Sequence, residues 1–217
     1  MLKSIEDIKI EGKRVFLRLD FNVPLSFEGG TVTVTDDTRI REALPTIEHA
    51  LKRGARLIIA SHLGRPKPTA DGKRDPQFSL EPIAARLQEL VNADVMLLEE
   101  CVGDGVEMIV KHMKNSQIIM LENLRYHAEE EANDLEFSKQ LAALADVYIS
   151  DAFGTTHRKH ASTYGVPALM PLRGHGFLIQ KEITFLSRLL DNPKSPYVAI
   201  LGGSKVSDKI KTIEKLF

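Results

Sequence analysis

Basic and amide side chains gather in four short segments of this chain, each directly after a run of apolar residues. The segments are LDFNVP at 19–24, SHLGRP at 61–66, ENLRYH at 122–127 and SDAFGTTHRKH at 150–160. They carry Arg65, Arg125 and Arg158. A guanidinium group binds phosphate and carboxylate oxygens bidentately, so it both attracts and orients an anion. In a chain with a formal net charge of −1, three converging arginines indicate a small, strongly anionic ligand.

Further polar side chains lie in or near these segments. Asp20 and Asn22 can exchange hydrogen bonds with a ligand hydroxyl, or they can serve only the turn before Pro24. Arg39 opens the helix after a predicted hairpin and would join the other arginines. Each arginine alone fits a solvated position or a local ion pair. Their agreement in residue type and position favours a site for the set.

Three histidines belong to the same segments: His62, His157 and His160. The sequence HRKH places cations between two of them, which disfavours a bound metal dication. We therefore predict no metal site. The histidines are either extra hydrogen-bond donors to an anion or ordinary loop residues.

A fifth polar segment, GGSK, precedes the last predicted helix. Gly202 and Gly203 let the backbone approach a phosphate, and Lys205 or Lys209 adds positive charge near a helix N-terminus. The pattern is weak by itself. The sequence holds neither G-x-x-x-x-G-K-[ST] nor G-x-G-x-x-G, so neither a P-loop enzyme nor a nicotinamide dehydrogenase is supported. It also lacks the G-x-S-x-G elbow of serine hydrolases.

The elements that position these segments alternate between strand and helix. Apolar, mostly β-branched runs predict strands at 14–19, 56–60, 94–98, 117–121, 147–150 and 197–201. Helical spacing predicts helices at 40–51, 80–91, 102–114, 133–145 and 177–190. Gly54 would end the first helix and Ser79 would cap the second. Residues 24–34 predict a hairpin. This is an α/β fold with a Rossmann-like parallel sheet between two helical layers, and such sheets bind ligands beyond the carboxyl ends of their strands.

Composition excludes several classes of protein. The 29 Lys and Arg against 30 Asp and Glu argue against a general nucleic-acid binder. One cysteine, Cys101, rules out an intramolecular disulfide and a multi-cysteine zinc site, and its acidic neighbours suit a structural role. We find neither a signal peptide nor an apolar run of about 20 residues, so we expect no membrane span and a cytoplasmic location. The acidic run 129–131 is predicted on a solvated face.

Six motifs in order resemble those of phosphoglycerate kinases. They are RVFLRLDFNVPL, TDDTRI, SHLGRP, LENLRYH, SDAFGTTHRKHAS and VAILGGSKVSDKI, and together they cover nearly the whole chain. The resemblance implies a hinge-closing enzyme of two domains. One domain binds 3-phosphoglycerate and the other binds Mg-ADP or Mg-ATP. The reaction is reversible phosphoryl transfer between 1,3-bisphosphoglycerate and ADP in glycolysis, and the full-length protein is expected to be a monomer.

The resemblance also implies roles for individual residues. Arg39 and Lys205 are the expected catalytic residues, with nucleotide phosphates held by Gly202, Gly203, Lys205 and Lys209. The expected ligands of 3-phosphoglycerate are Asp20, Phe21, Asn22, Arg39, His62, Leu63, Gly64, Arg65, Arg125 and Arg158. Residues 1–175 correspond to the substrate-binding domain, 176–196 to an interdomain helix and linker, and 197–217 to the start of a nucleotide-binding domain.

Members of this family are roughly twice as long as this chain. We therefore expect these 217 residues to be the substrate-binding half and to be inactive alone. The Mg²⁺ and adenosine sites would lie mostly outside it. Two alternatives stay open. One is a non-catalytic anion-binding module of the same fold, and the other is a single-domain nucleotide-binding protein that uses GGSK. The final strand and helix belong either to an edge of the same sheet or to a second domain.

Overall fold

The computed structural model describes residues 3–67 and 73–191, together with positions 198, 200, 210 and 214. The chain divides into two compact units, Met1–Ile179 and Gln180–Phe217. The predicted division at 175 and 196 stays a prediction, and the predicted strand at 197–201 lies outside the described residues. No helix in the described part of the chain is long and apolar enough to cross a membrane.

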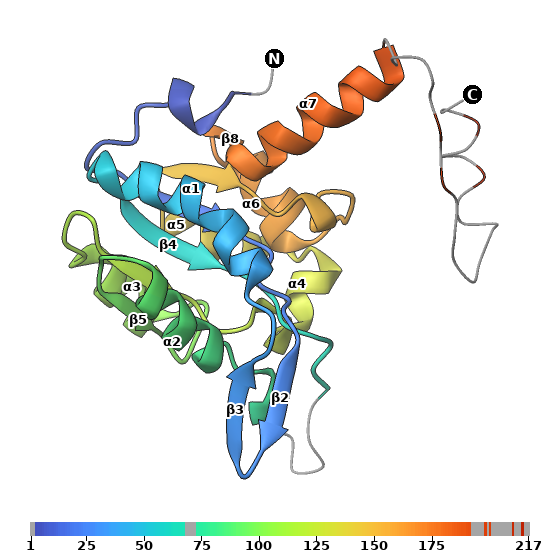
Figure 1. The fold of residues 1–217 in the computed structure, drawn as a ribbon. Helices are drawn as coiled ribbons and strands as arrows, with labels where there is room; N and C mark the ends of the chain where they lie inside the picture. The colour runs from blue at the N-terminus through green and yellow to red at the C-terminus, as the bar shows by residue number, and fades with distance from the viewer. Residues whose placement is uncertain are drawn as a thin grey trace. The chain divides into compact units, whose positions relative to one another are not determined.

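Within the described residues the first unit is built on a six-stranded sheet whose neighbouring strands all run parallel (Figure 1). In spatial order the strands are β5 (Val95–Leu97), β6 (Ile118–Met120), β4 (Arg56–Ala60), β1 (Arg14–Arg18), β7 (Val147–Ser150) and β8 (Arg173–His175). Five of them lie where the apolar runs predicted strands. The α/β fold class is therefore confirmed.

Helices cover both faces of this sheet because strand side chains alternate between the faces. The described helices of the first unit are α1 (Thr38–Lys52), α2 (Glu81–Leu90), α3 (Asp104–Lys111), α4 (Ala128–Ala132), α5 (Leu135–Ala143) and α6 (Val166–Leu169). Helix α7 (Phe177–Asp191) begins in the first unit and continues into the second. Val15 and Leu17 of β1 pack in the core beneath α1 and α2, whereas Phe16 packs in the opposite core beneath α3 and α5. Burial on both faces explains why the strands are apolar throughout.

Turn residues act largely as predicted. Gly54 has φ +71° and follows the last residues of α1. The hairpin forms from β2 (Leu25–Glu28) and β3 (Thr31–Val34), with Gly29 and Gly30 at positive φ between them. The prediction for Ser79 was wrong by one residue, because α2 has Leu80 at its N-cap. The Ser79 hydroxyl instead donates to Glu122 Oε2 at 2.8 Å while accepting from the amide of Glu81 at 3.2 Å.

Strand β8 was not predicted, because its sequence Arg-Gly-His has no apolar alternation. Its backbone pairs with β7 on one side and with the N-terminal segment on the other. The amide of His175 donates to the carbonyl of Lys3 at 3.0 Å, and Ser4 forms a parallel bridge to His175. A Cβ atom on Gly174 would lie 2.4 Å from the Lys3 carbonyl oxygen, so the close approach requires glycine.

The first turn of α7 is held by a buried carboxylate at the end of β7. Asp151 accepts a hydrogen bond from the amide of Ile179 at 3.0 Å and another from the Thr46 hydroxyl at 2.5 Å. The Thr46 oxygen in turn accepts from the amide of Phe177 at 2.9 Å. Burial raises the pKa of Asp151 despite these bonds. One threonine of α1 therefore links β7 to the start of α7.

Candidate anion-binding site

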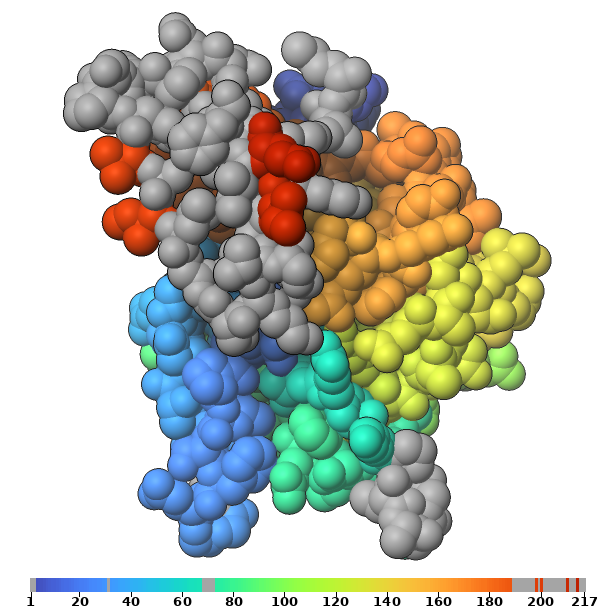
Figure 2. Space-filling view, turned by 90° about the vertical axis from the view of Figure 1, so that its right-hand side faces the viewer, coloured from blue at the N-terminus to red at the C-terminus, as the bar shows by residue number. Residues whose placement is uncertain are grey.

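The carboxyl ends of β1, β4 and β7 bring three of the polar segments to one edge of the sheet, and a short helix after β6 (η3, Leu124–Tyr126) adds the fourth. Figure 2 looks onto the molecule from the side towards which β4 points in Figure 1. The segments after β1 and β4, in blue and teal, adjoin the yellow and orange segments around η3 and after β7. The predicted convergence is therefore found in the first unit.

Arg18, the last residue of β1, is almost completely buried at this edge. Its Nε donates to the Ser162 hydroxyl at 2.9 Å, and its Nη1 donates to the carbonyl of Leu19. Its Nη2 lies 3.3 Å from His62 Nδ1. Our sequence analysis did not select Arg18, because we assigned it to an apolar strand. An arginine at the carboxyl end of a strand buried on both faces was the signal that could have found it.

His62 lies near several positively charged side chains. Burial, together with the nearby guanidinium groups of Arg18, Arg125 and Arg158, lowers the pKa of His62 to about 2. The imidazole is only 4% exposed. It is therefore neutral at physiological pH and contributes hydrogen bonds to the site rather than charge.

Arg125 is a buried guanidinium without a full set of partners. Its side chain is 6% exposed, and its Nη1 donates to the carbonyl of Gly64 at 2.6 Å. Its Nε forms an ion pair with Glu131 Oε1 at 3.2 Å, but this buried atom has no hydrogen-bond partner among the described residues. Burial lowers the pKa of Arg125; the charge of Glu131 opposes this shift, and the neighbouring arginines add to it. Such a group gains strongly from an incoming anion.

Hydrogen bonds between backbone groups of the loop after β4 and nearby side chains hold this loop in place. Gly64 has φ +57°, and a Cβ atom there would lie 2.4 Å from the Phe78 ring, so the position requires glycine. The Gly64 amide donates to Asn22 Oδ1 at 2.8 Å. Leu63 exchanges two hydrogen bonds with the buried side chain of Asn123. Leu63 and Gly64 thus position the basic residues around them.

The loop after β1 is tied to the same place. The amide of the buried Phe21 donates to the Ser61 hydroxyl at 2.9 Å. Asp20 Oδ2 accepts from Arg39 Nη1 at 2.7 Å, and the amide of Asn22 donates to Asp20 Oδ1 at 3.3 Å. The guanidinium of Arg39 is half exposed, whereas Asp20 is largely buried. Asp20 therefore holds Arg39 at the site with one face open to solvent.

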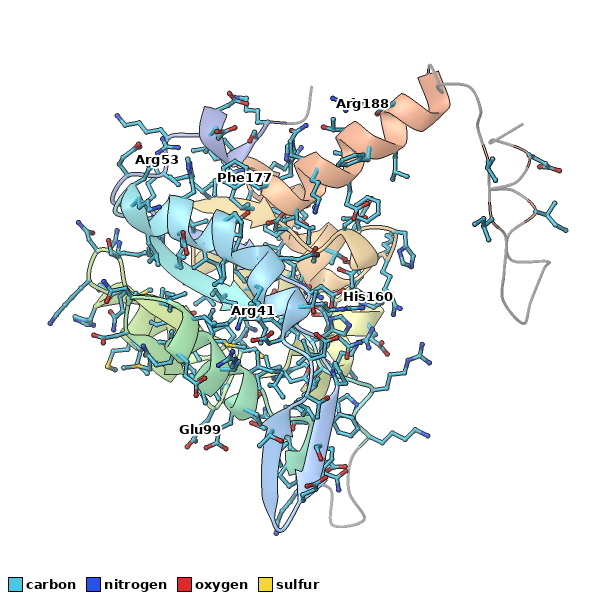
Figure 3. The ribbon with its side chains drawn as sticks, viewed as in Figure 1. Arg41, Arg53, Glu99, His160, Phe177 and Arg188 are labelled. Carbon is cyan, nitrogen blue, oxygen red and sulfur yellow. The ribbon has the colours of Figure 1, made fainter. Side chains whose placement is uncertain are left out.

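The remaining basic residues differ in their exposure. Arg65 is exposed, and it forms no hydrogen bond or ion pair with the rest of the described chain. Arg158 is half buried, and its Nε has no hydrogen-bond partner. His157 is exposed. His160 lies beside α4 in Figure 3, with Nδ1 3.9 Å from Glu130 Oε1, and burial lowers the pKa of His160.

The prediction that residues 129–131 lie on a solvated face was wrong for Glu130. Glu129 and Glu131 are exposed, but Glu130 is 1% exposed. Its two carboxylate oxygens accept from the amide and the hydroxyl of Ser162 at 2.9 and 2.6 Å. A buried carboxylate needs such donors, and η5 (Ala161–Gly165) supplies both of them.

The surface cavities do not mark this site. A cavity of about 600 Å³ lies between β3, α1 and α2, but its charged residues pair with one another, as Asp37 does with Arg41 and Arg86. A smaller cavity of about 260 Å³ reaches Arg125 and Lys67 at the border of the site. We therefore locate the site by Arg125 and Arg158, whose buried Nε atoms have no hydrogen-bond partner among the described residues, rather than by cavity volume.

The predicted nucleotide residues Gly202, Gly203, Lys205 and Lys209 lie outside the described residues. Within the part of the chain that the structure describes, no group of three His, Cys, Asp or Glu side chains could hold a metal ion. Cys101 is buried, its thiol donates to the carbonyl of Glu122 at 3.0 Å, and burial raises its pKa. These properties suit the structural role predicted for it.

Comparison with known proteins gives one consistent result. The phosphoglycerate kinase family model matches residues 5–217. A curated phosphoglycerate kinase from Anaeromyxobacter sp. (strain Fw109-5) is 53% identical over 215 residues, and one from Chlorobium phaeovibrioides is 51% identical. These matches cover 99% of this chain and 53% and 52% of the two relatives. The chain therefore spans about half the length of the curated relatives it matches.

Solved structures agree with the sequence relatives. The structure of phosphoglycerate kinase from Coxiella burnetii matches with a TM-score of 0.82 at 39% identity. That of phosphoglycerate kinase from Pyrococcus horikoshii OT3 matches with a TM-score of 0.84 at 32% identity. The matches cover 99% of this chain in both cases, and 51% and 52% of those chains.

Proposed function

This chain belongs to the phosphoglycerate kinase family, and from that premise we propose that it forms the half of such an enzyme that binds 3-phosphoglycerate. One observation carries the proposal. The guanidinium of Arg125 is buried beside those of Arg18 and Arg158, and its Nε has no hydrogen-bond partner in the part of the chain that the structure describes. A ligand with a phosphate and a carboxylate would supply the missing acceptors and negative charge.

We assign the ligand groups by the surroundings of each side chain. Arg65, Arg125 and Arg158 would bind the phosphate of 3-phosphoglycerate. Asp20 and Asn22 would hold its hydroxyl and carboxylate end, and Arg39 would neutralise the oxygens of that end. A carboxylate attacks phosphorus directly, so the chain needs no general base.

In the whole protein we propose reversible phosphoryl transfer between 1,3-bisphosphoglycerate and ADP, giving 3-phosphoglycerate and ATP. Bound Mg²⁺ with ATP would supply the transferable phosphoryl group in one direction, and Mg²⁺ with ADP would accept it in the other. Lys205, with Lys209, Gly202 and Gly203, would contact that group. These four residues lie outside the part of the chain that the structure describes. The work of this half is to bind, orient and neutralise its substrate, which is most of what phosphoryl transfer requires of a protein.

Calorimetric titration with 3-phosphoglycerate tests the proposed binding half. We expect saturable binding that weakens with added salt, because exposed charges are screened. Arg65→Ala should weaken binding about tenfold, as expected for the loss of a hydrogen bond to a charged group. Arg65 has no partner in the described chain, so its removal leaves the fold intact. Arg41→Ala is the control, since Arg41 is also exposed but is paired with Asp37.

Two results would contradict the proposal. Equal affinity for 3-phosphoglycerate and inorganic phosphate would support the non-catalytic anion-binding module instead. ATP binding stronger than 3-phosphoglycerate binding would support a nucleotide-binding protein that uses GGSK.

A further inference from the structure

Four buried side chains from four different elements form a continuous line of contacts behind the site. Glu130 of α4 contacts Ser162 of η5, Ser162 contacts Arg18 of β1, and Arg18 contacts His62 after β4. None of the four is more than 4% exposed. They are separated by up to 144 residues in sequence, so only the fold brings them together. The candidate site uses His62 but gives no role to Glu130 or Ser162.

The contact between Arg18 and His62 determines where the imidazole carries its proton. A guanidinium has only N–H donors, so Nδ1 of His62 must accept the bond from Arg18 Nη2. In a neutral imidazole the proton then lies on Nε2. His62 therefore keeps one N–H donor for another partner.

The remaining contacts explain why Arg18 reaches His62. Two of its nitrogens are occupied, because Nε donates to Ser162 and Nη1 donates to the carbonyl of Leu19. The Ser162 oxygen is oriented to accept, because its own proton goes to Glu130 at 2.6 Å. The amide of Ser162 fixes the second carboxylate oxygen at 2.9 Å. Without Glu130 the hydroxyl would be free to rotate and the guanidinium would lose its fixed plane.

We propose that Glu130 is a positioning residue, which acts through Ser162 and Arg18 to hold His62 as the Nε2–H tautomer and so gives the substrate a neutral hydrogen-bond donor. The low pKa of His62 agrees with a neutral ring. The other charged or titratable groups that act on it are Arg125 from η3, and Arg158 and His160 from the segment after β7. Only the identity of the ligand rests on the proposed function.

Nitrogen NMR of the ligand-free chain with ¹⁵N-labelled histidine tests the tautomer directly. We expect His62 to show an unprotonated Nδ1 and a protonated Nε2 between pH 5 and 8. Glu130→Gln should convert this signal into a mixture of tautomers. Ser162→Ala should also give a mixture of His62 tautomers. This variant tests the proposal if Glu130→Gln does not fold. Glu129→Gln is the matched control, because Glu129 is exposed on the same helix.

A His62 with its proton on Nδ1 in the unaltered chain would overturn the proposal. So would an unchanged tautomer in a folded Glu130→Gln or Ser162→Ala chain. The same variants should bind 3-phosphoglycerate about tenfold more weakly, whereas Glu129→Gln should not. If the tautomer changes as expected but no chain binds 3-phosphoglycerate, the proposed ligand is wrong and the role of Glu130 still holds.

Discussion

At the scale of the residue, a buried histidine makes the stability of the fold depend on pH. The pKa of His62 is about 2 in the folded chain, against an ordinary value of about 6.5. Between these values only the unfolded chain takes up a proton at this position. The stabilisation that depends on a neutral His62 is thus fully present above pH 6.5. As the pH falls below 6.5, the free energy of unfolding decreases by about 1.4 kcal/mol per pH unit.

We therefore predict that His62→Gln makes the free energy of unfolding less sensitive to acid. Urea unfolding at pH 7.5 and 5.5 measures the difference. The variant should lose about 1 kcal/mol less than the unaltered chain over this interval. His157→Gln is the control, because His157 is exposed. The free energy of unfolding of this variant should depend on pH as that of the unaltered chain does. An equal pH dependence in His62→Gln would refute the prediction.

The sequence predicted the residues that we propose as ligand contacts better than the buried residues behind them. Arg39, His62 and Arg125 were identified from residue type and position, and the structure brings them to one edge of the sheet. Arg18 and Glu130 were missed or misplaced. Arg18 could have been found from its place at the carboxyl end of a buried strand. The burial of Glu130 depends on Ser162, which is distant in sequence, so no local pattern distinguished Glu130 from a surface acid.

At the scale of the element, Thr46 links three parts of the fold that are distant in sequence. We predict that Thr46→Val lowers the free energy of unfolding by about 2–4 kcal/mol, because the Asp151 carboxylate and the Phe177 amide each lose a buried partner. Urea unfolding measures the loss. Thr35→Val is the matched control and should cost less than about 0.5 kcal/mol, since Thr35 is exposed. If Thr46→Val lowered the free energy of unfolding as little as Thr35→Val, the start of α7 would be held by apolar packing instead.

Apolar runs predicted five strands because strands buried on both faces must be apolar. The hairpin was predicted because two adjacent glycines allow its tight turn. Strand β8 carries neither signal. Its three residues become a strand because the backbones of β7 and of residue 3 lie on either side of them, and that arrangement is set by tertiary structure alone.

At the scale of the whole molecule, we predict that this chain alone does not catalyse 3-phosphoglycerate-dependent turnover of ATP. A substrate bound on one half has no aligned phosphoryl donor, and alignment supplies much of the rate in such reactions. A coupled assay measures turnover, with a full-length relative at the same molar concentration as the control. Turnover above background that Arg39→Ala abolishes would contradict the prediction.

The pairing of the N-terminal segment with β8 has a consequence for synthesis on the ribosome. Residues 3 and 4 leave the ribosome long before their backbone partner at 175, which is made last among the described strands of this sheet. At roughly 5–20 residues per second, about 10–35 s separate the two events. During this interval the apolar side chains of Ile5, Ile8 and Ile10, all buried in the finished fold, emerge without the strand that anchors their segment. Until β8 has been made, these isoleucines therefore lack the backbone pairing that fixes their segment in the finished fold.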